Sequence, residues 1–210
     1  MPPNLLIFAS GTKKGGGSGF ENLVRAAESG TLRAHIVGVV SNHEQGGVRE
    51  RAERLGMRFF HFPPPWTAEE YRRIKAEAGA EFCALSGWLK PVAGLASRTT
   101  FNIHPAPLPR FSGKGMYGLP LHRAVLDAYR KGELTHSAVT MHFVADEYDT
   151  GPVFFSTPVP IEPDDTPETL QARAKNIEHQ VQPIVTDKVV HGEIRFPHHP
   201  QPHLATKQYP

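Results

Sequence analysis

The stretch FNIHPAPLP, residues 101–109, predicts a β-strand that ends abruptly. Because side chains alternate along a strand, Asn102 and His104 are expected on one face while Ile103 points into the core. The prolines at 105, 107 and 109 lack an N–H and restrict the residue before each of them, so the strand stops there. An amide and an imidazole therefore stand together at a strand end, where open α/β sheets bind their ligands.

Strands alternate with helices on the N-terminal side of this stretch. Apolar or β-branched runs at 4–9, 33–41, 58–62 and 81–87 predict buried strands. Helical periodicity between these strands predicts three helices: one that ends at Gly30, one over 48–55 and one that begins after Thr67. Thr67 and Glu70 form a predicted capping box at the start of the third helix. This order predicts an α/β fold with a Rossmann-like, doubly wound and mostly parallel sheet in a single domain.

The C-terminal half adds a helix that follows Pro120 and ends at Gly132, strands at 136–144 and 153–161, and a long helix from Thr166. The DTGP turn between these strands is so short that we expect an antiparallel strand near the C-terminal part of the sheet. A short edge strand and a loose tail follow. The predicted boundaries are 1–196 for the domain and 197–210 for the tail.

Composition narrows the class of protein. The 210 residues carry a net charge of +2 with scattered basic residues, so we expect no nucleic-acid partner, and no apolar run is long enough for a membrane span. The start, MPPNLLIFAS, predicts a buried strand rather than a signal peptide. A single cysteine, Cys83, fits a cytoplasmic location and is expected to be a buried hydrophobe. The histidines of the tail lack metal-ligand spacing, and no metal is expected.

The glycine-rich segment SGTKKGGGSG, residues 10–19, lies between the first strand and the first helix. Free backbone N–H groups at a helix start suit a phosphate. The dinucleotide pattern fails because Phe20 stands at the sixth position from Gly15, and the Walker pattern fails because Gly17 takes the place of the lysine. The segment therefore predicts a phosphate monoester held by Gly17, Ser18 and Gly19 with Lys13 or Lys14 nearby, or else a flexible solvent loop.

Asn102, His104 and Asp149 form the candidate catalytic set. A neutral amide can hold an oxyanion, an imidazole can move protons near neutral pH, and a carboxylate can orient and charge that imidazole. This combination suits attack by an amine on an acyl group. The alternative is structural, since Asn and His beside prolines also satisfy turns.

Four motifs together resemble the folate-dependent formyltransferases: NIHP at 102–105, LP at 108–109, HFVADEYDTGP at 142–152 and EH at 178–179. Within that family the likeness is greatest to members acting in purine biosynthesis. It implies transfer of the formyl group of 10-formyltetrahydrofolate to the amine of glycinamide ribonucleotide. Asn102 and His104 would bind and protonate the formyl oxygen, while Asp149 would raise the pKa of His104 and organise a water that relays protons.

The same likeness implies the binding residues. The folate site would comprise Leu89, Lys90, Pro91, Val92, Asn102, Ala145, Asp146, Glu147, Tyr148 and Asp149. The ribonucleotide site would comprise Gly17, Ser18, Gly19, Lys175 and Glu178. The partners would be small molecules bound by a monomer or homodimer, and the Leu108–Pro109 bond would be cis.

Departures from the family pattern leave the acceptor open. The loops at 11–19 and 110–123 are longer than usual, Gly19 stands where an asparagine is frequent, and Pro120 is near a place where many relatives keep a histidine. One alternative is a formyltransferase that acts on an amino-sugar nucleotide or an initiator tRNA, and such enzymes carry an added C-terminal domain. Another alternative is a hydrolase of formyltetrahydrofolate, which carries an added N-terminal domain. A ligand-binding module without activity would not need His104 and Asp149 together.

Overall fold

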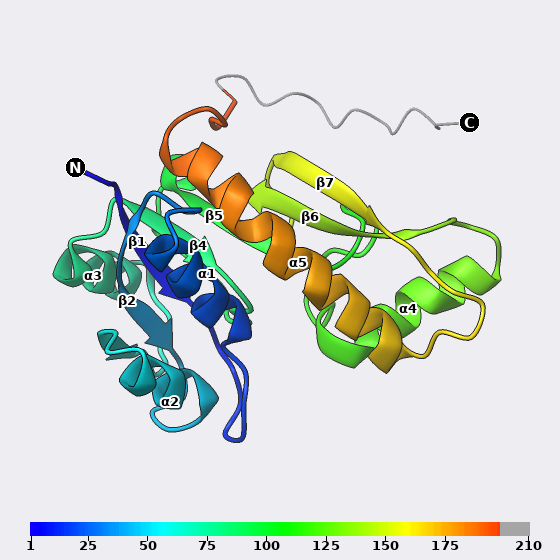
Figure 1. Cartoon of the computed structure of the whole chain (residues 1–210), viewed down its shortest axis with the longest axis horizontal. Helices are drawn as coiled ribbons and strands as arrows, with labels where there is room; N and C mark the ends of the chain where they lie inside the picture. Colours follow the sequence, from blue (N-terminus) through cyan, green and yellow to red (C-terminus); the bar gives the residue numbers. More distant parts are fainter. Residues whose placement is uncertain (198–210) are drawn as a thin grey trace.

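A computed structural model of the chain describes residues 1–197, and its centre is a seven-stranded sheet in the order β3-β2-β1-β4-β5-β6-β7 (Figure 1). The strands are β1 Asn4–Phe8, β2 His35–Ser41, β3 Phe59–His61, β4 Phe82–Leu85, β5 Thr100–His104, β6 Ser137–Phe143 and β7 Val153–Val159. The helices are α1 Ser18–Glu28, α2 Gly47–Arg54, α3 Ala68–Ala78, α4 Gly118–Arg130 and α5 Pro167–Val190, with a short 3₁₀ turn η1 at Ser97–Thr99. The predicted α/β fold is confirmed.

The direction of the strands follows the prediction. β1 to β5 pair in parallel, whereas β6 pairs antiparallel with both β5 and β7. β6 is thus the strand that runs against the other six, and residues 144–152 connect it to its antiparallel neighbour β7 without a crossover helix. The bond between Leu108 and Pro109 is cis, as the family likeness implies.

Two apolar clusters cover the two faces of the sheet. Along β1, Leu5 and Ile7 face the larger cluster, which lies under α1, α2, α4 and α5, while Leu6 and Phe8 face the smaller one under α3. Figure 1 shows α5 crossing the sheet diagonally beside α1. A central strand that is buried on both faces has no polar alternation, and the continuous apolar sequence of β1 agrees with this.

Local details differ from the sequence prediction at two places. The Thr67 side chain accepts a hydrogen bond from the Glu70 N–H, but the Glu70 carboxylate pairs with Arg73, so only half of the expected capping box forms. A full box stands instead at the start of α5, between Thr166 and Thr169. The expected edge strand after α5 is wrong, because residues 191–197 form turns and irregular backbone. Of the predicted tail, 198–210 lies outside the described residues.

The switch point of the sheet lies between β1 and β4. The chain continues from β1 to β2 on one side, and β4 and β5 follow on the other. Ligands of open α/β sheets bind in the crevice beyond the carboxyl ends of the strands at such a point. Gly17–Gly19 follow β1, and Ser86 follows β4, so the glycine segment and the end of β4 open into the same crevice. None of the helices in residues 1–197 combines the length and apolar character that crossing a bilayer requires.

Gly151 closes the turn between β6 and β7. A Cβ atom built on it would lie 1.8 Å from the Phe143 carbonyl oxygen, which is backbone and cannot move away cheaply. Gly151→Ala is therefore expected to lower the free energy of unfolding by about 1–3 kcal/mol in a urea titration. The control is Gly15→Ala, where φ likewise lies outside the left-handed region and no atom lies within 4 Å of the new Cβ. An equal loss in both variants would show that the close approach to Phe143 does not require glycine at 151.

Candidate active site

His104 ends β5 and is buried, with 4% of its surface exposed. Its Nε2 lies 2.9 Å from the Phe111 carbonyl oxygen. Because a carbonyl oxygen only accepts, Nε2 carries the hydrogen and the lone pair of the neutral ring is on Nδ1. Nδ1 faces Asp149 Oδ2 at 3.8 Å. The imidazole is thus held ready to accept a proton on the atom that faces the carboxylate.

Asp149 stands in a left-handed backbone conformation with φ +57°. Its Oδ1 accepts a hydrogen bond of 3.1 Å from the Asn102 amide. Burial opposes its ionisation, but the neighbouring His142, the proximity of His104 and the Gly113 N–H together outweigh burial and lower the pKa of Asp149. The carboxylate is therefore charged at neutral pH. The structure brings the three predicted catalytic residues together.

Asp149 raises the pKa of His104, as expected, but the net shift of that pKa is downward. Burial lowers the pKa of His104, and the attraction of Asp149 only partly offsets this loss of solvation. His142 contributes a further small repulsion. The sequence can place a carboxylate beside the imidazole, but it does not show that the ring is removed from water. His104 is therefore neutral at neutral pH and acts as a base before it can act as an acid.

His142, on β6, is a further member of the site that the sequence analysis did not single out. Its Nε2 lies 3.1 Å from the Asn102 amide nitrogen and 3.4 Å from Asp149 Oδ1. Its Nδ1 lies 2.9 Å from the Phe143 carbonyl and donates to it. In the antiparallel ladder His142 pairs directly with Asn102. Both strands were predicted, and the register between them is the signal that would have identified this residue.

His122 on α4 is a second buried histidine near the site. It is 1% exposed, and burial together with the nearby His104 lowers its pKa to about 4. Its Nδ1 has no hydrogen-bond partner within residues 1–197. The ring is thus a neutral polar wall of the cavity beside His104.

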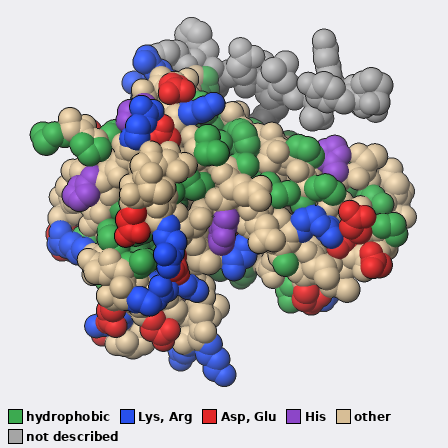
Figure 2. Space-filling view, in the orientation of Figure 1, with side chains coloured by type: hydrophobic (Ala, Val, Ile, Leu, Met, Phe, Trp, Pro, Cys, Tyr) green, Lys and Arg blue, Asp and Glu red, His purple; other side chains and the backbone are tan. Residues whose placement is uncertain are grey.

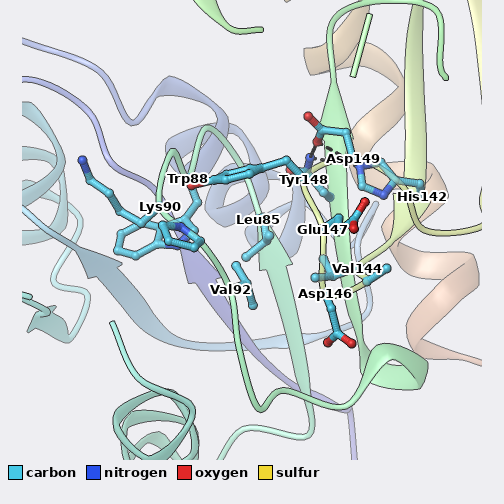
Figure 3. A pocket seen from close by; sticks show the side chains of 13 residues that line it. Leu85, Trp88, Lys90, Val92, His142, Val144, Asp146, Glu147, Tyr148 and Asp149 are labelled. Atoms are coloured by element: carbon cyan, nitrogen blue, oxygen red, sulfur yellow. Dashed lines mark hydrogen bonds and ion pairs between the residues drawn. The ribbon is translucent and has the colours of Figure 1, made fainter. Parts of the chain in front are cut away.

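A small cavity lies on one side of Asn102 and Asp149. Figure 3 shows Leu85, Trp88 and Val92 on one wall and the segment from Val144 to Asp149 on the other. The remaining lining residues are Lys90, Pro91, Asn102 and His142. Apart from Leu89, the residues predicted for the folate site therefore gather here.

Leu89 is the exception. It is 37% exposed and lines the larger cavity, while the three residues that follow it line the small one. Trp88 lines the small cavity in place of Leu89. Its Nε1 donates to the Tyr71 hydroxyl at 2.8 Å, and that hydroxyl donates to the Pro91 carbonyl at 2.7 Å. These two bonds fix the indole against the small cavity. The sequence analysis placed the right segment but not the direction of each side chain.

A larger cavity of about 900 Å³ lies on the other side of the catalytic residues. Gly17, Ser18 and Gly19 line it from the start of α1, and Lys175 and Glu178 line it from α5. The predicted ribonucleotide residues are therefore brought together. Burial raises the pKa of Glu178 to about 7, although Lys175 opposes this shift. Glu178 thus changes charge near neutral pH.

Lys13 and Lys14 do not take the expected place. Both are exposed at the tip of a small turn closed by Thr12 and Gly15, and neither lines the cavity, although Thr12 does. Lys114 and Lys175 line it instead. The turn extends away from the sheet because Thr12 and Gly15 bond to each other rather than to α1.

Charged side chains of both signs gather over α1 and α2, as Figure 2 shows. There Glu21 pairs with Arg25, Arg51 and Arg54, and the bond from Arg54 contributes most to lowering its pKa to about 2. Arg51 also donates to the Gly16 carbonyl at 2.8 Å. The cluster supports the glycine segment from behind, and because one carboxylate is shared by three guanidinium groups it keeps a net positive charge.

The described part of the chain offers no candidate site for metal or thiol chemistry. Residues 1–197 contain no group of three or more His, Cys, Asp or Glu side chains placed to hold a metal ion. Cys83 is fully buried, and burial raises the pKa of its thiol to about 12. It is the expected core residue and not a nucleophile.

The two cavities share a wall. Trp88, Asn102, Tyr148 and Asp149 line both of them, while His104 lines only the larger and His142 only the smaller. An amide donor, a proton acceptor and a carboxylate therefore stand where ligands from two cavities would meet. This arrangement suits transfer of a group between two bound molecules rather than hydrolysis of one.

Comparison with known proteins agrees with this geometry. The model of the family described as formyl transferase matches residues 4–186. A chloroplastic phosphoribosylglycinamide formyltransferase from Arabidopsis thaliana is 32% identical over 98% of this chain and 72% of its own length. The one from Vigna unguiculata is 34% identical over 84% of this chain, which spans 57% of that relative. The crystal structure of glycinamide ribonucleotide transformylase 1 from Geobacillus kaustophilus has 31% identity and a TM-score of 0.76, covering 90% of this chain and all of that one.

Proposed function

This chain belongs to the formyl transferase family, and on that premise we propose that it transfers a formyl group from 10-formyltetrahydrofolate to the amine of glycinamide ribonucleotide in purine biosynthesis. The observation that carries the proposal is the shared wall between the two cavities, with Asn102 and Asp149 in it. The reaction has two substrates, and one acyl carbon must be reached from both sides. The enzyme is thus a one-carbon transferase.

The small cavity fits a folate head group. Its walls combine the indole of Trp88 with Leu85 and Val92, which suit a flat ring, and the segment 144–149 offers backbone groups for a heterocycle. The Lys90 ammonium lies 5.0 Å from the Trp66 ring centroid, at the rim of this cavity. A positive charge there suits the carboxylates of a folate tail.

The larger cavity fits the ribonucleotide. The N-terminus of α1 has no side-chain cap, so its first N–H groups are free for a phosphate. Lys175 adds positive charge, and Glu178 offers a carboxylate for the hydroxyl or amine groups of the substrate. The phosphate would then lie near Gly17–Gly19 with the amine directed toward His104.

The chemistry follows from the three catalytic residues. The amine nitrogen attacks the formyl carbon, a new C–N bond forms, and the carbonyl electrons move to oxygen. The Asn102 amide would donate to this oxygen in exchange for its bond to His142 Nε2. The proton lost by the amine passes to His104 Nδ1, directly or through a water, and the resulting imidazolium is stabilised by Asp149. The electrons then return, the bond between carbon and the folate nitrogen breaks, and that nitrogen takes the proton.

Glu178 gives this assignment a pH signature. Its pKa of about 7 means that its carboxyl gains negative charge as pH rises through neutrality. The KM for the ribonucleotide is expected to fall over this range, and Glu178→Gln is expected to raise that KM about tenfold at about pH 8 and to flatten its dependence on pH. Glu168→Gln, at the exposed rim on the same helix, should keep the dependence. If Glu178→Gln kept the wild-type dependence of this KM on pH, Glu178 would have no part in binding the ribonucleotide.

The test of the function is a steady-state assay with 10-formyltetrahydrofolate and a panel of amines between about pH 6 and pH 9. We expect rapid formylation of glycinamide ribonucleotide and far slower formylation of an amino-sugar nucleotide. Faster turnover of the sugar nucleotide would overturn the acceptor assignment while leaving the family intact. The cytoplasmic location and the monomeric or homodimeric state stay predictions.

A further inference from the structure

Gly19 is the second residue of α1, where glycine is an unfavourable choice for a helix. It is not one of the glycines with a left-handed backbone, so its conformation does not require glycine. Glycine stands here because there is no room for a side chain. A Cβ atom at this position would lie 2.2 Å from the Ser86 hydroxyl oxygen and 3.5 Å from Gln182 Oε1. The start of α1 is thus packed directly on two polar side chains.

Ser86 and Gln182 form a buried pair at the switch point of the sheet. Ser86 follows β4 and is 8% exposed, Gln182 comes from α5 and is 1% exposed, and the Ser86 hydroxyl donates to Gln182 Oε1 at 3.3 Å. A buried primary amide ordinarily has partners for its nitrogen as well. Within residues 1–197 the Gln182 nitrogen has none, and both side chains line the larger cavity.

The pair lies beside hydrogen-bond donors that have no acceptor in the described chain. The free N–H groups of α1 and the Gln182 amide nitrogen are all donors, and they converge on the cavity beside Gly19. An anion with several oxygens would satisfy them together, and the phosphate monoester of the proposed ribonucleotide is such a group. Gly19 is then glycine because a side chain there would displace the hydroxyl.

We propose that Ser86 and Gln182 bind the ribose-phosphate end of the acceptor and determine its affinity. This inference rests on the proposed function. Gln182 donates through its amide nitrogen to a phosphate or ribose oxygen, and Ser86 fixes the orientation of that amide by occupying Oε1. The pair contributes to binding in the ground state and the transition state alike, so it acts on KM rather than on kcat.

The first test compares Ser86→Ala and Gln182→Met with the wild type. Each is expected to raise the KM for glycinamide ribonucleotide about tenfold, with kcat and the KM for the folate nearly unchanged. Titration calorimetry with ribose 5-phosphate should show the same loss without any turnover. Ser137→Ala is the matched control, since Ser137 is equally buried in β6 with no partner for its hydroxyl in the described chain.

The second test uses Gly19→Ala, alone and together with Ser86→Ala. The single variant is expected to lose affinity for ribose 5-phosphate and to melt at a lower temperature, because its Cβ displaces the hydroxyl. In the double variant the new Cβ meets Ser86 Cβ and Gln182 Oε1, each at 3.5 Å, which are ordinary contacts, so the melting temperature should recover. The affinity should stay as low as in Ser86→Ala, because the hydroxyl is gone.

The outcomes separate the two proposals. Lower melting temperatures with unchanged KM and unchanged ribose 5-phosphate affinity would show that the pair only joins α5 to the sheet, and the inference would fall. A wild-type enzyme that does not formylate the ribonucleotide would overturn the proposed function. Calorimetry with ribose 5-phosphate would still decide the role of Ser86 and Gln182 in that case.

Discussion

Replacing His104 with alanine is expected to lower kcat by about 10²- to 10⁴-fold, the range found for the loss of a general base. The KM for the folate should change little, because His104 does not line the small cavity. The reason is that Nδ1 is the proton acceptor, and the bond from Nε2 to the Phe111 carbonyl holds it toward Asp149. Steady-state kinetics with each substrate varied in turn would measure both constants.

The pH profile adds a second readout for His104. Burial lowers its pKa below the ordinary value of 6.5, so the base stays neutral at neutral pH. Wild-type kcat, measured at saturating ribonucleotide so that the titration of Glu178 does not enter, should therefore fall only below that value, as the ring gains a proton, and this fall should be absent from the alanine variant. His136→Ala, an exposed histidine at the start of β6, is the control and should leave the profile unchanged. Full turnover in His104→Ala would contradict the assigned role.

Asp149→Asn is expected to lower kcat by about 10²- to 10³-fold with the fold intact. Asparagine is one of the few residues that tolerate the left-handed backbone at this position, where φ is +57°. The amide can still contact Asn102, but it carries no charge to stabilise the imidazolium of His104. Circular dichroism and melting temperature would establish that the loss is chemical and not structural.

Asp164→Asn provides the matched control, since Asp164 is an exposed carboxylate in the turn before α5. It should keep wild-type kinetics. If Asp149→Asn also kept wild-type kcat, the carboxylate would be a structural support of the loop after β6, and the pairing with His104 would have no catalytic meaning.

The sequence was sufficient for the fold and for naming three residues of the proposed catalytic set that the structure brings together. The alternation in FNIHPAPLP placed Asn102 and His104 at a strand end, and the DTGP motif supplied Asp149. These inferences rest on local periodicity and on turn chemistry, which are properties of short segments. His142 was missed because its place depends on the register between β5 and β6, which a single strand does not contain.

The burial of the site residues also could not be predicted from the sequence. The charge of Asp149 is visible in the sequence, but the loss of solvation that lowers the pKa of His104 arises from the packing of residues distant in the chain. The same holds for the contact of Gly19 with Ser86, which lie in separate parts of the chain and meet only at the switch point. Leu89 likewise belongs to the expected segment but points to the other cavity.

The most direct test of the account follows an isotope-labelled formyl group. Wild-type enzyme is incubated with labelled 10-formyltetrahydrofolate and glycinamide ribonucleotide, and the label is located by nuclear magnetic resonance. The account predicts that the label appears on the amine of the ribonucleotide, and that Asp149→Asn slows its appearance without diverting it. Label released as free formate in the presence of the ribonucleotide, or label left on the folate, would contradict it.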